Sequence, residues 1–306
     1  MKLQQLKYIC EVVKQDLNLS KAAAELYTSQ PGVSKQIRAL EDELGVDIFI
    51  RHGKRFTGIT EPGRAIIQKA QAALTDLNSL RNISNEFTNE TSGSLKIATT
   101  HTQARYALPL VIKQFREKFP NVKLSLYQGS PTQISQMTSS GEADIAIATE
   151  AISLEKDLAL LPCYQWNRCI LTPPKHPLLR SKRVSLEEIS EFPIITYDFA
   201  FTGRSKINQA FEEKGLKPDV ILTAIDADVI KTYVELELGI GIVAMMAYDP
   251  ARDTKIRALD ASHLFEASTT RIGLRKHSYI RGYVYEFISM FAPHLNKKAV
   301  DSILTS

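Results

Sequence analysis

Residues 19–45 read LSKAAAELYTSQPGVSKQIRALEDELG and decide the fold of the first part of the chain. Three consecutive alanines predict a short helix over residues 21–27, with Ser20 as its N-cap. The TSQP stretch at 28–31 ends that helix and begins another, because a proline in a first helical turn loses no hydrogen bond. The apolar residues that follow recur at steps of four, three and four: Val33, Ile37, Leu40 and Leu44. They predict a second helix that buries one face and ends at Gly45.

The residues on either side extend this unit. An apolar stripe from Leu3 to Leu17 predicts a helix before it. Residues 47–51 and 55–59 predict two strands joined by a tight turn at His52-Gly53-Lys54. We therefore expect a winged helix-turn-helix over residues 1–60, all-α apart from the wing.

A polar helix presented after a short turn has the geometry that fits the major groove of DNA. Glutamine can read an adenine edge and arginine a guanine edge, whereas serine and lysine reach phosphates. The predicted DNA-binding residues are Ser20, Thr28, Ser29, Gln30, Pro31, Ser34, Lys35, Arg38, Arg51, Lys54 and Arg55. The alternative is an ordinary helical domain with a solvated basic face, since the net charge of the whole chain is only +4. The order of helix, turn, polar helix and basic hairpin favours DNA.

A long helix is expected next. Thr60 can cap it, and its apolar and small residues step by four and three at Ile66, Ala70, Ala73, Leu77, Leu80, Ser84 and Phe87. This spacing is typical of a coiled-coil seam and predicts a linker and dimerisation helix over residues 61–90. The polar stretch TNETSGS at 88–94 marks a domain boundary.

The rest of the chain, residues 91–306, alternates between strand and helix patterns. Strands are expected at 95–99, 123–128 and 143–148, with helices at 103–115 and 132–140 between them, and further units follow from residue 169. This alternation predicts an α/β domain with a largely parallel sheet.

Long runs of the sequence resemble the LysR-type regulators. They are LSKAAAEL at 19–26, SQPGVS at 29–34 and IRALEDELG at 37–45. TTHTQARY at 99–106, GSPTQI at 129–134 and FTGRS at 201–205 resemble the branch of that family that contains the CysB regulators. The resemblance implies an effector domain of two Rossmann-like subdomains, similar to periplasmic binding proteins. We place the first subdomain at 91–162 and 267–306 and the second at 163–266.

The same resemblance implies an effector site. Its residues would be Thr100, Thr102, Gln103, Thr149 and Thr202. Hydroxyls and backbone donors at a helix start suit an anion, and ligands bind beyond the carboxyl ends of strands in open α/β sheets. The alternative is that these threonines only cap helices. Trp166, the only tryptophan, is as well explained as a wall of the cleft as by a core or interface position.

The resemblance further implies a homodimer or homotetramer that binds double-stranded promoter DNA and RNA polymerase and regulates sulfur assimilation and cysteine biosynthesis. The small-molecule effector would be acetylserine-type, sulfate or a related sulfur anion, with no other cofactor. Two alternatives remain: a solute-binding or sensor protein, and a paralogue with a narrower role in sulfonate use or sulfate starvation.

Enzyme patterns are weak. Residues 239–244 match GxGxxG/A, but a helix precedes them and a strand follows, the reverse of a dinucleotide site. The sequence has no GxSxG, P-loop or HExxH, and its histidines show no metal-ligand spacing. We expect neither an enzyme nor a metal protein. With three scattered cysteines and no signal-peptide or membrane-span pattern, we expect a cytoplasmic protein.

Overall fold

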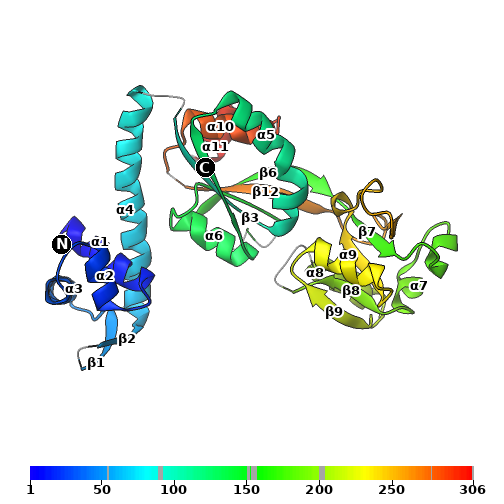
Figure 1. The fold of residues 1–306 in the computed structure, drawn as a ribbon, viewed down its shortest axis with the longest axis horizontal. Coiled ribbons are helices and arrows are strands. Elements are labelled where there is room, and N and C mark those ends of the chain that lie inside the picture. Colours follow the sequence, from blue (N-terminus) through cyan, green and yellow to red (C-terminus); the bar gives the residue numbers. More distant parts are fainter. Residues whose placement is uncertain are drawn as a thin grey trace. The chain divides into compact units, whose positions relative to one another are not determined.

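The computed structural model describes residues 1–53, 55–88, 92–149, 152, 157–199, 204–276 and 278–304, with the backbone alone at 78, 79 and 81–88. The chain forms two compact units, Met1–Thr88 and Asn89–Ser306 (Figure 1). In the part of the chain described, no helix is both long and apolar enough to cross a membrane.

The first unit is a winged helix-turn-helix with a long helix after it. Its elements are α1 (Leu3–Lys14), α2 (Leu19–Glu25), α3 (Gln30–Leu44), the antiparallel hairpin β1 (Phe49–His52) and β2 (Arg55–Ile59), and α4 (Glu61–Thr88). Ser29 caps α3 by accepting from the Gly32 N–H at 3.3 Å, and Gly45 ends that helix in the left-handed region at φ +70°. The predicted N-cap of α2 was wrong by two residues. Asn18, rather than Ser20, is its N-cap, since the Asn18 Oδ1 accepts from the N–H groups of Ser20 and Lys21.

The helix α4 has two parts with different surroundings. Ile67 and Ala70 are buried in the core of the first unit, and Ile66 packs against it. Leu77 and Leu80 are 39 % and 63 % exposed. The predicted coiled-coil seam therefore has two environments. The residues of its first turns pack inside the first unit, and its later leucines are exposed at the surface. Ser84 and Phe87 lie outside the described side chains.

The second unit contains two five-stranded sheets. The first sheet has the order β4-β3-β5-β12-β6, with β3 (Gly93–Thr99) parallel to both β4 (Val122–Gln128) and β5 (Ile145–Ala148). The strand β12 (Ser268–Arg275) runs antiparallel to β5 and to β6 (Leu158–Trp166). The helices of this half are η1 (Gln103–Ala107), α5 (Leu108–Lys118), α6 (Pro131–Ser139), α10 (Gly282–Phe291) and α11 (Lys297–Leu304).

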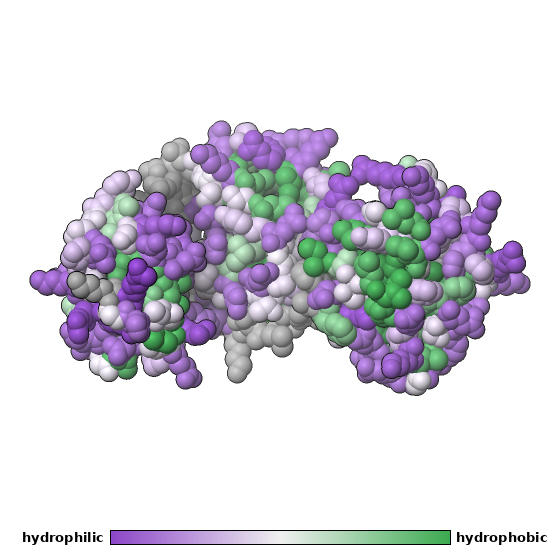
Figure 2. Space-filling model, turned by 60° about the horizontal axis from the view of Figure 1, so that its bottom comes forward, coloured by the Kyte–Doolittle hydropathy of each residue, from purple (hydrophilic) through white to green (hydrophobic). Residues whose placement is uncertain are grey.

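The second sheet has the order β11-β7-β10-β8-β9. Its strands are β7 (Arg168–Thr172), β8 (Ile194–Tyr197), β9 (Val220–Ala224), β10 (Ile240–Ala244) and β11 (Arg257–Asp260). The helices α7 (Leu186–Ser190), α8 (Arg204–Glu213) and α9 (Ala227–Glu235) belong to this half. Figure 2 shows apolar side chains gathered over the lobe that carries this sheet. Exposed apolar residues of this half include Phe199, Ile221, Ile225, Val229, Leu236 and Leu238.

Both sheets are mixed, so the expectation of a largely parallel sheet was wrong. The reason is the connection between them. β6 continues into β7 through Asn167 alone, and β11 leads back to β12 through a short segment. A parallel neighbour needs a long crossover, whereas these direct connections leave the returning strands antiparallel to their neighbours. β6 also runs on to Trp166, past the boundary predicted after Pro162, and pairs there with Ser268.

Candidate nucleic-acid interface and effector site

The helix α3 and the wing form a concave surface, and the hollow that it encloses has a volume of about 530 Å³. Its lining residues are Gln30, Pro31, Ser34, Lys35, Arg38, Arg51, Gly53 and Phe56. The burial of Val33, Ile37 and Leu40 on one side of α3 turns its polar stripe outward. An adjoining hollow of about 520 Å³ brings Ser20 and Arg55 beside Gln30. Thr28 and Ser29 are exposed just before α3, and Lys54 lies outside the described residues.

One buried carboxylate joins α3 to the wing. Glu41 is 4 % exposed, and its Oε1 accepts from the backbone N–H groups of Ile48 at 2.9 Å and Phe49 at 3.2 Å. Its Oε2 accepts from the Arg51 guanidinium, which also lies 5.0 Å from the centre of the Phe56 ring. Arg51 therefore lines the concave surface while it is paired to Glu41. Sequence reasoning missed Glu41, although an acid four residues after Ile37, on the apolar side of α3, was a usable signal.

In the second unit, Thr100, Thr102, Gln103 and Thr149 are all buried. β3 and β5 are parallel neighbours, so their carboxyl ends meet at one edge of the first sheet. Thr100 and Thr102 follow β3 where the helix containing η1 begins, and Thr149 follows β5. The structure thus brings these three threonines to one sheet edge. Thr202 lies outside the described residues.

The side chain of Gln103 is already engaged. Its amide donates to the Thr270 Oγ1 at 3.1 Å, and its Oε1 accepts from the Tyr164 hydroxyl. These partners come from β12 and β6, the strands that lead to and from the second sheet. Gln103 therefore ties the helical segment 101–118, which we call the effector helix after its proposed role, to the connecting strands. One hydrogen of its side-chain amide remains.

Within the part of the chain described, the Nδ1 of His101 is buried without a hydrogen-bond partner. The buried Thr102 hydroxyl lies beside the Tyr197 hydroxyl. Burial raises the pKa of Tyr197, so this phenol stays neutral and can donate. Trp166 is buried at the junction of β6 and β7, with the Arg168 guanidinium 5.2 Å from its ring centre and its own indole N–H unpartnered. Unpaired buried polar groups are uncommon in folded proteins, so each of these atoms needs an explanation.

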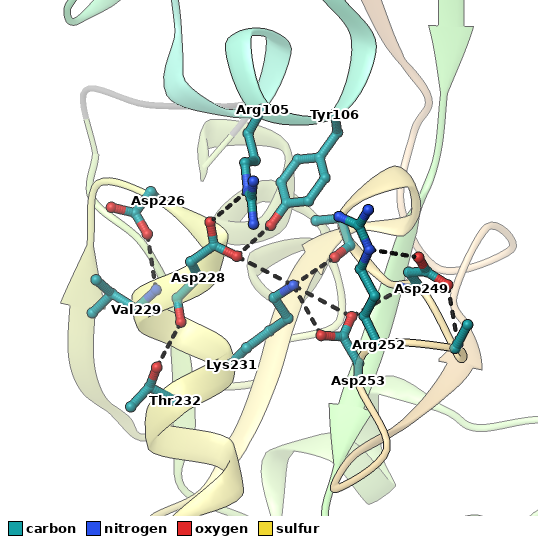
Figure 3. Close-up of polar contacts among 12 residues, drawn as sticks. Arg105, Tyr106, Asp226, Asp228, Val229, Lys231, Thr232, Asp249, Arg252 and Asp253 are labelled. Atoms are coloured by element: carbon teal, nitrogen blue, oxygen red, sulfur yellow. Dashed lines mark hydrogen bonds and ion pairs between the residues drawn. The ribbon is translucent and has the colours of Figure 1, made fainter. Parts of the chain in front are cut away.

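A polar cluster joins the effector helix to the second sheet's half (Figure 3). The Tyr106 hydroxyl donates to the Asp228 Oδ1 at 2.7 Å, and the Arg105 Nε lies 3.4 Å from its Oδ2. The Lys231 Nζ lies 3.3 Å from Asp228 and 3.1 Å from Asp253. Burial opposes ionisation of Asp228, but the Tyr106 hydrogen bond and the two cations outweigh it and hold its pKa below the ordinary value. No local sequence pattern signals this contact, because Tyr106 and Asp228 are far apart along the chain.

His101, Asp226 and Asp228 place possible metal-ligand atoms within 4.8 Å of one another. The carboxylate of Asp228 is however shared with Arg105 and Lys231. Their positive charges oppose a divalent ion at the same oxygens. The cluster is better described as part of the contact between the two halves.

Comparison with known proteins agrees with this architecture. Residues 3–64 match the family model described as "Bacterial regulatory helix-turn-helix protein, lysR family", and residues 88–296 match the one described as "LysR substrate binding domain". The chain is 59 % identical to the HTH-type transcriptional regulator SsuR of Burkholderia cenocepacia over 99 % of both chains. It is 51 % identical to the HTH-type transcriptional regulator CysB of the same organism, over 99 % of this chain and 97 % of the relative.

A solved structure of the cofactor-binding domain of the Cbl transcriptional regulator is also similar. Its TM-score is 0.69 at 45 % identity, and the match covers 72 % of this chain and 96 % of that one. The two family models together span both units, and the relatives match from end to end. The chain therefore belongs to the lysR family of bacterial helix-turn-helix regulators, which are transcriptional regulators and not enzymes.

Proposed function

We propose that this regulator reads promoter DNA with α3 and the wing and controls sulfur-assimilation and cysteine-biosynthesis genes. The observation that carries the DNA interface is the concave surface that gathers Gln30, Ser34 and Arg38 on one side of α3. Arg38 is exposed there and suited to a guanine edge, whereas Lys35 and Arg55 supply attraction to the phosphates. The proposed interface is completed by Ser20, Thr28, Ser29, Pro31, Arg51 and Lys54.

The effector is proposed to be an acetylserine-type inducer or a sulfur anion. The buried hydroxyls of Thr100, Thr102 and Thr149 at one sheet edge support it, because they donate hydrogen bonds without adding a competing charge. The runs that resemble the CysB branch, and the identity to regulators named SsuR and CysB, support the link to sulfur. Thr202 stays in this proposed site by resemblance alone, with Gln103 at its edge.

We further propose that the protein works in the cytoplasm as a homodimer or homotetramer joined partly through α4, and that it contacts RNA polymerase on the promoter. Residues 1–60, 61–90 and 91–306 are the proposed DNA-binding, dimerisation and effector regions.

The test compares Arg38→Ala with Arg64→Ala, which removes the same charge from the exposed side of α4. Full-length proteins are titrated by fluorescence anisotropy against a duplex that the wild type selects from random sequences, and against its scrambled version. Arg38→Ala should lose about 1–3 kcal/mol on the selected duplex and little on the scrambled one. Arg64→Ala should keep the ratio between the two affinities. An equal loss of Arg38→Ala on both duplexes would refute base readout by Arg38.

A further inference from the structure

The buried side chain of Arg204 has two nitrogens that find no acceptor among the described residues. Arg204 is the first residue of α8 and is 4 % exposed. Its Nε and Nη1 atoms are both buried and have no hydrogen-bond partner. Leaving the donors of a buried cation unpaired is among the costlier arrangements in a protein, so a group of this kind needs a reason.

The described surroundings of Arg204 compensate its positive charge only in part. The guanidinium carbon lies 5.1 Å from the centre of the Phe199 ring, a cation–π contact that supplies no hydrogen-bond acceptor of the carboxylate kind. Asp198 is near enough to act on it electrostatically, but among the described residues it forms no ion pair with Arg204 and has contacts of its own. Burial lowers the pKa of Arg204, although an arginine stays charged at neutral pH.

The position of Arg204 suits a negatively charged ligand. It follows β8, and the first amides of α8 have no partner within that ten-residue helix. A helix N-terminus favours an anion, and the buried guanidinium adds a full positive charge to it. The last residue of β8, Tyr197, is adjacent to Thr102, so this end of the second sheet meets the start of the effector helix.

We propose that Arg204 is the charged receptor for the anionic group of the effector, which it binds from the side of the second sheet. The ligand class is an oxyanion: a sulfate, a sulfonate or a carboxylate. This inference rests on the proposed function, because it takes the threonines of the first sheet as the other side of the same site. Those hydroxyls would orient the ligand, and Arg204 would supply the charge that selects anions over neutral molecules.

The test is a pair of measurements on the full-length protein. Variants Arg204→Met, Arg204→Lys and Lys214→Met are compared with the wild type, and Lys214 is an exposed lysine just after α8. Thermal unfolding in chloride measures the cost of the buried charge. Isothermal titration with sodium sulfate, methanesulfonate and acetate at fixed ionic strength measures anion binding and separates the three oxyanions.

We expect Arg204→Met to unfold in chloride at the same temperature as the wild type or higher, because it removes a buried charge that no described residue pairs with. Its affinity for the preferred oxyanion should fall about tenfold or more. Arg204→Lys, which keeps the charge but has fewer donors, should bind with intermediate affinity, and Lys214→Met should bind as the wild type does.

Three results would overturn the proposal. The first is an unchanged oxyanion affinity of Arg204→Met, and the second is a wild type that binds none of the three anions. The third is a marked fall in the unfolding temperature of Arg204→Met in chloride, because that would give Arg204 an internal structural role. Sequence-specific DNA binding is measured on the same proteins. If it is present while oxyanion affinity does not depend on Arg204, this inference fails and the DNA-binding proposal stands. If the wild type shows no sequence preference, the DNA-binding proposal fails irrespective of the anion result.

Discussion

The carboxylate of Glu41 accepts hydrogen bonds from three groups. It accepts from two backbone N–H groups at the start of the wing and from the Arg51 side chain. The geometry of the wing relative to α3 therefore depends on one carboxylate beneath the proposed DNA interface. A hydrogen bond to a charged group contributes about 1.5–3 kcal/mol, so this residue is expected to influence both folding and DNA contact.

Glu41→Gln should lower the free energy of unfolding by about 1–3 kcal/mol, since the amide keeps the shape but cannot balance the charge of Arg51. Urea unfolding of the full-length protein measures this. Glu43→Gln, on the same helix but exposed, is the control and should change the free energy by less than about 0.5 kcal/mol. Equal unfolding midpoints for the two variants would rule out the anchoring role of Glu41.

Thr100 is buried at the edge of the first sheet, so its substitution tests the proposed effector site. Thr100→Val keeps its shape but removes one donor, which should weaken binding of an anionic effector by about 1.5–3 kcal/mol. DNA affinity without effector should stay unchanged, while its response to added effector is lost. Thr223→Val, at an exposed position of β9, is the control. A normal response in Thr100→Val, with unchanged affinity for every sulfur compound tested, would remove Thr100 from the site.

At the scale of elements, α4 serves two purposes along its length. Its first turns complete the core of the winged helix-turn-helix through Ile67 and Ala70. The exposed leucines further along are apolar surface that a partner helix can bury. Self-association through this helix should therefore depend on Leu77 and Leu80 and much less on Ile66.

Leu77→Glu should shift the full-length protein toward smaller oligomers in sedimentation velocity, because a carboxylate in an apolar helix contact has no counter-charge. The helix itself should persist, since glutamate is a good helix former. Gln68→Glu adds the same charge at another exposed position of α4 and serves as the control. If Leu77→Glu sediments as the wild type does, the dimer contact lies elsewhere.

At the scale of the whole second unit, the two sheet-bearing halves meet where Tyr106 donates to Asp228. Asp228 also faces Arg105 and Lys231, so the contact depends on an ionised carboxylate. The effector helix that carries Tyr106 begins at Thr100 and Thr102. A ligand at its start can therefore shift the arrangement of the halves, to the extent that it binds one arrangement better.

Asp228→Asn should destabilise the protein at pH 7 by about 1 kcal/mol, a small value because the carboxylate is partly exposed. The pKa of Asp228 is lowered in the folded protein, so its contribution is present above the unfolded-state pKa and is lost as the pH falls below about 4. Thermal unfolding of the wild type and of Asp228→Asn is measured from pH 7 to pH 3. The difference between their unfolding temperatures should become smaller as the pH falls over that range. Asp219→Asn, an exposed control, should not reproduce it, and a difference that is constant with pH would contradict the role of the Asp228 charge.

Short-range patterns in the sequence were enough to predict most of the local elements. The apolar period of α3, the proline and serine at its start, Gly45 at its end and the alternation of strands with helices are short-range patterns, and the backbone follows them. Tertiary structure alone decided which strands pair, that both sheets are mixed, that Ile67 and Ala70 close the core of the first unit, and that Tyr106 meets Asp228. These contacts join residues far apart in the chain, and their free energy comes from burial and pairing in the folded protein, which no local pattern of residues encodes.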